Sequence, residues 1–215
     1  MATVAVIDYG MGNIRSVSKA LEYVGGDNHV IVSYDPERIR QADRIVLPGV
    51  GALRDCMSEI QRLELDDVIR ECSVSKPFLG VCLGMQALMD YSSENNGTRG
   101  LGVIPGRVSH FNERTQHQPV ATKLKVPHMG WNQVNQAKSH RLWRNIDQNS
   151  RFYFVHSYFV ISESPDIIAG TTDYGGIFTS VIAQDNIFAV QFHPEKSQHS
   201  GLELLANFMR WDGVS

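Results

Sequence analysis

The sequence predicts an α/β fold with three layers: a mostly parallel central sheet with helices on both faces, and an antiparallel extension. Two observations lead to this prediction. Over residues 1–100, apolar strand-like runs alternate with segments of helical periodicity, the pattern of a parallel sheet covered on both faces. From residue 101 onward, short strands and turns follow one another, which is typical of hairpins and antiparallel edge strands. The length of 215 residues suits a single domain, 1–215.

The elements of the first half follow from apolar runs, helical spacing and turn residues. An apolar run at 3–8 predicts a strand, and apolar residues at 14, 17, 21 and 24 predict the helix that follows it. The other elements expected here are a strand at 29–33, a short helix after Asp35-Pro36, a strand at 44–47, a helix at 53–72, a strand at 77–81 and a helix from 84 through 89.

The second half is expected to consist mainly of strands. The spacing of Leu202, Leu205, Phe208 and Met209 predicts an amphipathic terminal helix. The polar stretch 112–119 is the best candidate for a mobile loop. The expected strands lie at 106–111, 120–126, 133–134, 151–161, 167–171, 178–183 and 187–192.

Composition excludes several classes of partner. A formal net charge of −3 and a pI near 6.2 provide no basic field for phosphates, so no nucleic-acid partner is expected. No apolar stretch approaches the roughly 20 residues that span a bilayer, and the residues after Met1 lack a charged signal-peptide start. We therefore expect no membrane association and a cytoplasmic location.

No cofactor and no metal are expected. The turn Gly10-Met11-Gly12-Asn13 has two glycines of a dinucleotide-binding pattern, but Arg15 stands where the third glycine belongs. The eight histidines are dispersed without metal-ligand spacing. Cys56 and Cys72 lie in helix-like segments and read as small buried apolar residues. Only Cys82 has neighbours that point to chemistry.

Cys82 stands where a strand turns sharply into a helix, in G-V-C-L-G-M-Q. A glycine two residues to either side gives the form of a nucleophile elbow, which projects the side chain above the sheet. A free thiol is mostly protonated at pH 7, so a helix end and a nearby imidazole are needed to make it an effective nucleophile. As a pattern alone, G-x-C-x-G also fits a purely structural turn.

His193 and Glu195 end an apolar strand and are separated by Pro194. Residues two apart in extended backbone face the same way, and proline favours extended geometry before it, so imidazole and carboxylate lie side by side. Glu195 can hold one ring nitrogen while the other takes the Cys82 proton. A surface His and Glu at a strand end is the alternative interpretation.

Pro48-Gly49-Val50-Gly51 follows a strand directly, and its glycines let backbone N–H groups turn toward a ligand. The motif suits an oxyanion hole, with one donor from the Val50 region and another from the amide of Leu83. A glycine turn that opens a helix is the structural alternative. The same glycines make the segment 48–51 a two-state element, whose amide can turn toward the ligand or away from it.

Together, these motifs resemble the class I, or triad, glutamine amidotransferase family. Within it, further stretches are similar to the glutaminase subunits of imidazole glycerol phosphate synthases: D-Y-G-M-G-N-I at 8–14, P-H-M-G-W-N at 127–132, Y-F-V-H-S-Y at 153–158 and Q-F-H-P-E-K-S at 191–197. The resemblance implies that Cys82, His193 and Glu195 hydrolyse L-glutamine to glutamate and ammonia. The residues that it assigns to glutamine binding are Gly49, Gly51, Gln86, Glu94, His156, Ser157 and Tyr158.

The resemblance also implies a partner. Ammonia would pass to a cyclase subunit with a (β/α)8-barrel fold, in a heterodimer that forms imidazole glycerol phosphate and an aminoimidazole carboxamide ribotide. Trp131 and Tyr153 equally fit core aromatics, because burial and interfaces use the same residue types. The positions that match the family at or near that interface are Asn13, Met129, Trp131, Tyr153 and Lys196.

Three rival interpretations remain open. The chain fits the glutaminase subunit of another synthase, such as those for anthranilate, carbamoyl phosphate or GMP, although the segments at 8–14 and 127–132 weigh against this. A non-catalytic scaffold is disfavoured by the intact Cys, His and Glu. A cysteine amidase or peptidase working alone is the third. The chain departs from the family in a long polar stretch at 112–125 and in Gly25-Gly26-Asp27.

Overall fold

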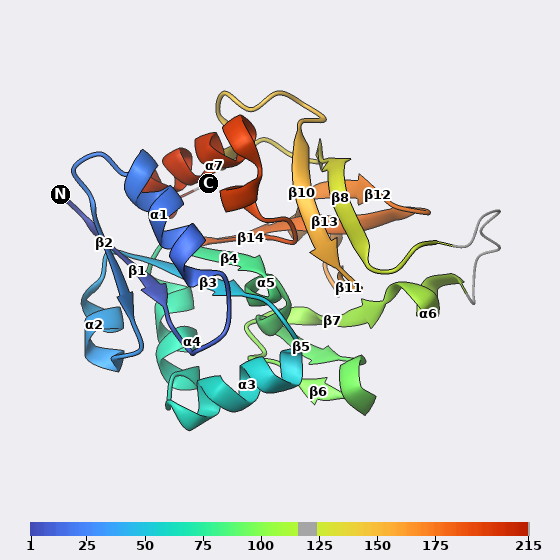
Figure 1. The fold of residues 1–215 in the computed structure, drawn as a ribbon, viewed down its shortest axis with the longest axis horizontal. Helices are drawn as coiled ribbons and strands as arrows, with labels where there is room; N and C mark the ends of the chain where they lie inside the picture. Colours follow the sequence, from blue (N-terminus) through green and yellow to red (C-terminus); the bar gives the residue numbers. More distant parts are fainter. Residues whose placement is uncertain (116–123, 215) are drawn as a thin grey trace.

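The computed structural model describes residues 1–115 and 124–214. Five strands form the parallel half of a large twisted sheet, with their carboxyl ends at one edge (Figure 1). Each buried strand is rich in Val, Ile and Leu, as expected for strands covered on both faces. In spatial order they are β2 (His29–Ser33), β1 (Thr3–Ile7), β3 (Arg44–Gly49), β4 (Phe78–Cys82) and β14 (Ile187–Val190).

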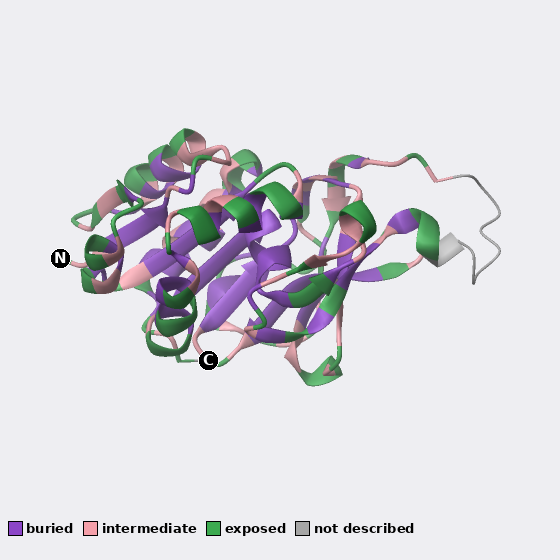
Figure 2. Cartoon of the chain, turned by 90° about the horizontal axis from the view of Figure 1, so that it is seen from below, coloured by how far each residue is buried: buried purple, intermediate pink, exposed green. Residues whose placement is uncertain are grey.

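Helices cover both faces of this half, and the alternation of side chains along β1 separates the two cores. Val4 and Val6 belong to the apolar cluster that contains Leu21 of α1, whereas Ala5 and Ile7 belong to the cluster on the other face. Figure 2 shows the buried strands between helices whose outer sides are exposed. One face carries α1 (Ile14–Val24) and α7 (Gln198–Arg210), and the other carries α2 (Pro36–Gln41), α3 (Leu53–Arg62) and α4 (Asp66–Ser75).

Antiparallel strands extend the sheet beyond β14, which confirms the predicted fold class. A separate two-stranded sheet, β8 (His128–Gln133) with β10 (Arg151–His156), stands beside it (Figure 1). The extension contains β13 (Ile177–Gln184), β11 (Tyr158–Ser162), β7 (Ile104–His110), β5 (Met89–Ser92), β6 (Thr98–Arg99), β12 (Ile168–Asp173) and β9 (Asn135–Gln136), in which only β5 and β7 pair in parallel.

The expected helix at 53–72 is wrong as a single element. It breaks into α3 and α4 at Leu63-Glu64-Leu65, where Glu64 adopts the left-handed region with φ 55°. The expected helix from 84 through 89 is also too long, since α5 is Leu83–Ala87 and the chain then enters β5. The backbone carbonyls of Ala87 and Met89 accept hydrogen bonds from residues 101 and 102, which replaces further helical bonding.

Other differences concern short elements and the strand at 151–161, which is divided at Ser157 between β10 and β11. β8 begins at His128, earlier than the expected strand at 133–134. Residues 111–115 form α6 (Phe111–Thr115), while the rest of the expected loop at 112–119, and residues 120–123 of the strand expected at 120–126, lie outside the described residues. Short 3-10 turns are η1 (Glu94–Asn96), η2 (Arg141–Trp143), η3 (Pro165–Ile167) and η4 (Pro194–Lys196).

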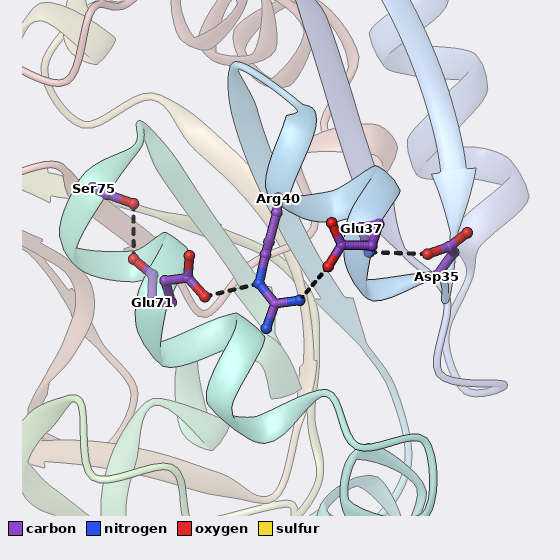
Figure 3. A network of polar contacts seen from close by, with 5 residues as sticks. All are labelled: Asp35, Glu37, Arg40, Glu71 and Ser75. Atoms are coloured by element: carbon purple, nitrogen blue, oxygen red, sulfur yellow. Dashed lines mark hydrogen bonds and ion pairs between the residues drawn. The ribbon is translucent and has the colours of Figure 1, made fainter.

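A polar network joins α2 to α4 at the surface (Figure 3). Asp35 accepts a hydrogen bond from the backbone N–H of Glu37 and so caps α2. Arg40 contacts Glu37 at 2.8 Å and Glu71 at 2.9 Å. Exposed ion pairs contribute little to stability, so burial of apolar side chains such as Ile39 holds α2 in place. Within the described residues, no helix is both long and apolar enough to cross a membrane.

Gly84→Ala should strongly destabilise the protein, because a Cβ at Gly84 would lie 1.9 Å from the backbone oxygen of Leu47 in β3. We expect a loss of about 3 kcal/mol or more in the free energy of unfolding, measured by urea denaturation. Gly26→Ala is the matched control: Gly26 has φ 57° but no atom within 4 Å of the added Cβ, so only about 1–2 kcal/mol of backbone strain is expected. Equal losses in the two variants would contradict the close approach at Gly84.

Candidate active site

The site lies where the carboxyl ends of β3, β4 and β14 meet. Gly49 is the register partner of Cys82, and Val81 is the partner of Val190, so the three segments that follow these strands come together. Ligands of open parallel sheets bind at this edge. A cavity of about 320 Å³ opens here, and it is lined by Cys82, His193 and the predicted residues at 50, 51, 83, 86, 94 and 156–158, together with Pro127 and Val155, which sequence reasoning did not select.

Cys82 has the strained geometry of an elbow. Its φ of 54° and ψ of −108° are unusual for a residue with a side chain, and it directly precedes α5. The glycines on either side permit this turn: a Cβ at Gly80 would lie 3.2 Å from the backbone nitrogen of Met85, and Gly84 lies against β3. The turn therefore aims the Cys82 side chain into the cavity, where only 6% of the residue is exposed.

His193 and Glu195 form the predicted pair. His193 Nδ1 lies 2.9 Å from Glu195 Oε1, and the two side chains are 2% and 0% exposed. The backbone N–H of His193 donates to the carbonyl of Tyr153 in β10, and the Ser197 hydroxyl donates to the carbonyl of His193. Among the described atoms, His193 Nε2 has no hydrogen-bond partner. This nitrogen is thus held in place and free to exchange a proton with a group in the cavity.

The electrostatics of His193 favour its charged form. Burial alone would lower its pKa, but the nearby negative charge of Cys82, and then the hydrogen bond and charge of Glu195, raise it to about 10. Because the pKa is raised in the folded state, protonation of His193 stabilises the fold. This stabilisation is fully present below the ordinary pKa of 6.5 and is lost as the pH rises through about 10. A buried imidazolium beside a sulfur is the arrangement that activates a thiol.

The segment after β3 forms the wall opposite His193. Val50 and Gly51 line the cavity, and Gly51 has φ 97°. Gly49 is buried, and a Cβ there would lie 2.4 Å from the hydroxyl of Tyr9. That hydroxyl donates to the carbonyl of Pro48 at 2.8 Å, and burial, with Cys56 and Cys82 nearby, raises the pKa of Tyr9 well above its usual range. A permanently protonated phenol therefore fixes the start of this segment.

The predicted glutamine-binding residues line the cavity except Gly49, which is buried behind it. Several of them already hold protein partners. Glu94 Oε2 accepts the backbone N–H of Leu53 at 2.7 Å. Gln86 Nε2 donates to the carbonyl of Tyr158 at 3.1 Å and to Gln191 Oε1 at 3.0 Å. His156 Nδ1 also donates to the carbonyl of Tyr158, at 2.7 Å. These bonds leave the second carboxylate oxygen of Glu94 and the amide oxygen of Gln86 for a ligand, whereas both ring nitrogens of His156 are already engaged, since its Nε2 lies 2.9 Å from His128 Nδ1.

Gln191 is a residue that sequence reasoning missed. It is fully buried, and its Nε2 lies 3.6 Å from the sulfur of Cys82. The sequence could have identified Gln191, because residues two apart in extended backbone face the same way and Gln191 stands two residues before His193.

The predicted interface residues gather on the small sheet and beside it. Met129 is 62% exposed and Trp131 is 43% exposed, so Trp131 is not a core aromatic. Tyr153 packs edge-on to Trp131 with ring centroids 6.1 Å apart, and Lys196 Nζ lies 5.9 Å from the Tyr153 ring. Asn13 belongs to a different element: it precedes α1, and its Oδ1 accepts the hydroxyl of Ser16. Exposed apolar side chains beside the cavity are typical of a partner surface.

A family model described as glutamine amidotransferase class-I matches residues 5–211. The chain belongs to the class-I glutamine amidotransferase family. Similar members include the imidazole glycerol phosphate synthase subunit HisH of Nitrosococcus oceani, 58% identical over 215 residues and covering 100% of both chains. The subunit HisH 1 of Pseudomonas aeruginosa is 55% identical over 213 residues and covers 99% of each.

Solved structures of lower identity share the fold of this amidotransferase. PurLQS from Thermotoga maritima matches with a TM-score of 0.69 at 16% identity, over 98% of this chain and 99% of that one. A structure described as a glutamine amidotransferase matches with a TM-score of 0.65 at 15% identity, over 97% and 99%. At such identities the likeness bears on the fold alone.

Cys82→Ala and Glu195→Gln should each lower the pKa of His193. Each change removes an interaction that favours the imidazolium, whereas burial, which favours the neutral ring, remains. We expect the larger decrease in Cys82→Ala, because the interactions with Cys82 are the stronger ones. The measurement is an NMR titration of the His193 ring. Glu22→Gln, at an exposed carboxylate of α1, is the control; an unchanged His193 midpoint in both site variants would contradict this electrostatic account.

Proposed function

We propose that this chain is the glutaminase subunit of an imidazole glycerol phosphate synthase in L-histidine biosynthesis. It hydrolyses L-glutamine to glutamate and ammonia. The observation that carries the proposal is the buried His193–Glu195 pair at 2.9 Å, sharing one cavity with Cys82 at a strained elbow. The full-length relatives named as HisH subunits, at 55% and 58% identity, support the choice of synthase over the anthranilate, carbamoyl phosphate and GMP alternatives.

The proposed chemistry is acyl transfer through a thioester. The Cys82 sulfur attacks the δ-carbonyl carbon of glutamine, and its proton resides on His193. His193 then protonates the amide nitrogen as the carbon–nitrogen bond breaks, so ammonia leaves. Water, deprotonated by the same imidazole, attacks the thioester and releases glutamate and the thiol. Glu195 holds the ring in position and favours the imidazolium, the role of the carboxylate in a triad.

Two backbone amides are proposed to stabilise the negative oxygen of each tetrahedral intermediate. Leu83 follows the nucleophile and Val50 lines the opposite wall, so both lie beside the reacting carbon. Recognition of glutamine needs partners for its ammonium, its carboxylate and its amide. Glu94 suits the ammonium because it is a carboxylate in the cavity wall, held in place by the backbone N–H of Leu53 in the first turn of α3. The remaining contacts are proposed for Gly49, Gly51, Gln86, His156, Ser157 and Tyr158.

The proposed partner is a cyclase subunit with a (β/α)8-barrel fold, in a heterodimer that operates in the cytoplasm. Met129 and Trp131 offer exposed apolar area of the kind that interfaces bury, and Tyr153 with Lys196 joins this patch to η4. Asn13 is proposed to extend the contact, because α1 packs against η4. Ammonia released at Cys82 would pass between the subunits on this side.

Cys82→Ala should abolish glutamine-dependent synthesis but preserve synthesis from added ammonia. The change removes the nucleophile, whereas the partner cyclase retains its own site, so ammonia bypasses the lost step. The assay is formation of imidazole glycerol phosphate by the complex of this chain with a cyclase subunit, supplied with the ribonucleotide substrate and either nitrogen source. Loss of the ammonia-driven reaction as well would argue against this division of labour.

Glutamate release should be slow for the isolated chain and strongly stimulated by the cyclase subunit with its ribonucleotide. The physical reason is the proposed two-state backbone at 48–51, in which the glycines permit the Val50 amide to turn toward or away from the cavity. Glutamate is measured enzymatically, with Cys82→Ala as the blank. Robust activity of the lone chain would refute partner gating, and stimulation by a different synthase in place of the cyclase would favour the rival assignment.

A further inference from the structure

The carbonyl oxygen of Tyr158 is the junction of two hydrogen-bonded arms. It accepts from Gln86 Nε2 at 3.1 Å and from His156 Nδ1 at 2.7 Å. A carbonyl can only accept, so both neighbours must present a hydrogen to it. This single backbone group therefore fixes the orientation of the Gln86 amide and the tautomer of neutral His156.

The first arm leads to the nucleophile. Because Gln86 presents its Nε2 to Tyr158, the same nitrogen donates its second hydrogen to Gln191 Oε1 at 3.0 Å. Gln191 must then point its own amide nitrogen the other way, and that nitrogen lies 3.6 Å from the sulfur of Cys82. Both glutamine side chains are buried, with Gln86 4% and Gln191 0% exposed, so water does not compete for these groups.

The second arm leads away from the cavity. His156 donates through Nδ1, so in its neutral form Nε2 accepts, and it lies 2.9 Å from His128 Nδ1. His128 thus donates through Nδ1 and accepts at Nε2, where Asn132 Nδ2 lies at 3.2 Å. Burial lowers the pKa of His128 to about 4 and, with the His128 and His193 charges adding to it, that of His156 to about 3. Both rings remain neutral, as this order requires.

The second arm ends on the strand that carries the exposed apolar patch. His128 and Asn132 belong to β8, as do Met129 and Trp131. His128 is the register partner of His156 across the small sheet, and the chain leaves this sheet at Ser157 to enter the large one. The arms join at that crossing, so they connect β8 to the sulfur through hydrogen bonds whose directions are all determined.

From this arrangement we propose that Gln191 is a positioning residue for the Cys82 thiolate, and that His128, through His156 and Tyr158, holds Gln191 in its donating orientation. The inference rests on the proposed function, in which Cys82 attacks as a thiolate. A buried amide N–H aimed at sulfur stabilises its negative charge and fixes the direction of its attack, since hydrogen bonds to charged groups are the strong ones. Gln191 is not among the residues that line the cavity, so its proposed role is to act through Cys82.

The first test is the reactivity of Cys82 in Gln191 variants. Gln191→Leu has a similar size but no donor, and Gln191→Glu replaces the donor with a carboxylate that repels the thiolate. We expect the pH midpoint of Cys82 alkylation by iodoacetamide to rise in both, further in Gln191→Glu. In the complex with the cyclase, kcat for glutamate release should fall about tenfold or more while KM changes little. Circular dichroism and thermal melting establish that each variant is folded.

The second test separates the histidine arm from simple packing. The His128 ring stacks on Phe154 and Tyr174, with centroids 4.8 and 4.0 Å apart. His128→Phe keeps a flat ring there but removes the donor to His156, whereas His128→Asn is smaller but keeps an N–H near the position of Nδ1. We expect a raised alkylation midpoint and a lowered kcat in His128→Phe, and values near the wild type in His128→Asn. His140→Asn, at the histidine that precedes η2 and caps that turn through Nδ1, is the control.

The outcomes of these two tests can be distinguished from a failure of the proposed function. Alkylation reports on Cys82 without glutamine or partner, so a raised midpoint in Gln191→Leu supports the inference even where the synthase assignment fails. An unchanged midpoint and unchanged kcat in folded Gln191→Leu would overturn it. Equal defects in His128→Phe and His128→Asn would assign the effect to packing and remove His128 from the proposal. Should Gln191→Leu fail to fold, Gln191→Glu and the His128 pair carry the test.

Discussion

The site depends on the close approach of α5 to β3, which only a glycine at position 84 allows. That approach lets the chain turn at Cys82 with φ 54° and places Leu83 against Gly49, so the ends of β3 and β4 enclose one cavity. β14, paired to the other side of β4, then delivers His193 to the same place. The packing of the backbone between α5 and β3 thus determines where the polar side chains of the site lie.

Two buried histidines in this cavity are driven to opposite charge states by their partners. His193 faces Cys82 and Glu195, and these interactions outweigh burial, so its pKa is raised to about 10. His156 faces a carbonyl and His128, and burial dominates, so its pKa is lowered to about 3. Burial is common to both rings, so the difference lies in whether an anion is within reach. One histidine is therefore equipped to move protons, and the other to hold a fixed hydrogen-bond direction.

Much of this frame was predictable, because β1 and β2 are continuous apolar runs and the elbow has its own glycine pattern. The break between α3 and α4 could not be predicted, because Glu64 adopts the left-handed region although the sequence has no Gly or Pro at that point. β8 was not predicted over its full length because three of its six residues are exposed and M-G-W-N shows no apolar alternation. Contacts such as Gln86 to Gln191 join residues 105 positions apart, and no local pattern reports them.

The division of the chain between two sheets explains why a polar connection, rather than apolar packing, links β8, with its exposed Met129 and Trp131, to Cys82. β10 ends at His156 and β11 begins at Tyr158, so Ser157 is the joint between the small sheet and the large one. Apolar contacts across such a joint would tolerate small displacements. Hydrogen bonds with fixed donors and acceptors are directional, so a displacement of β8 changes their geometry as far as Gln191. The segment at 48–51 is held through Tyr9 instead, so the two sides of the cavity are fixed by separate hydrogen-bonded contacts.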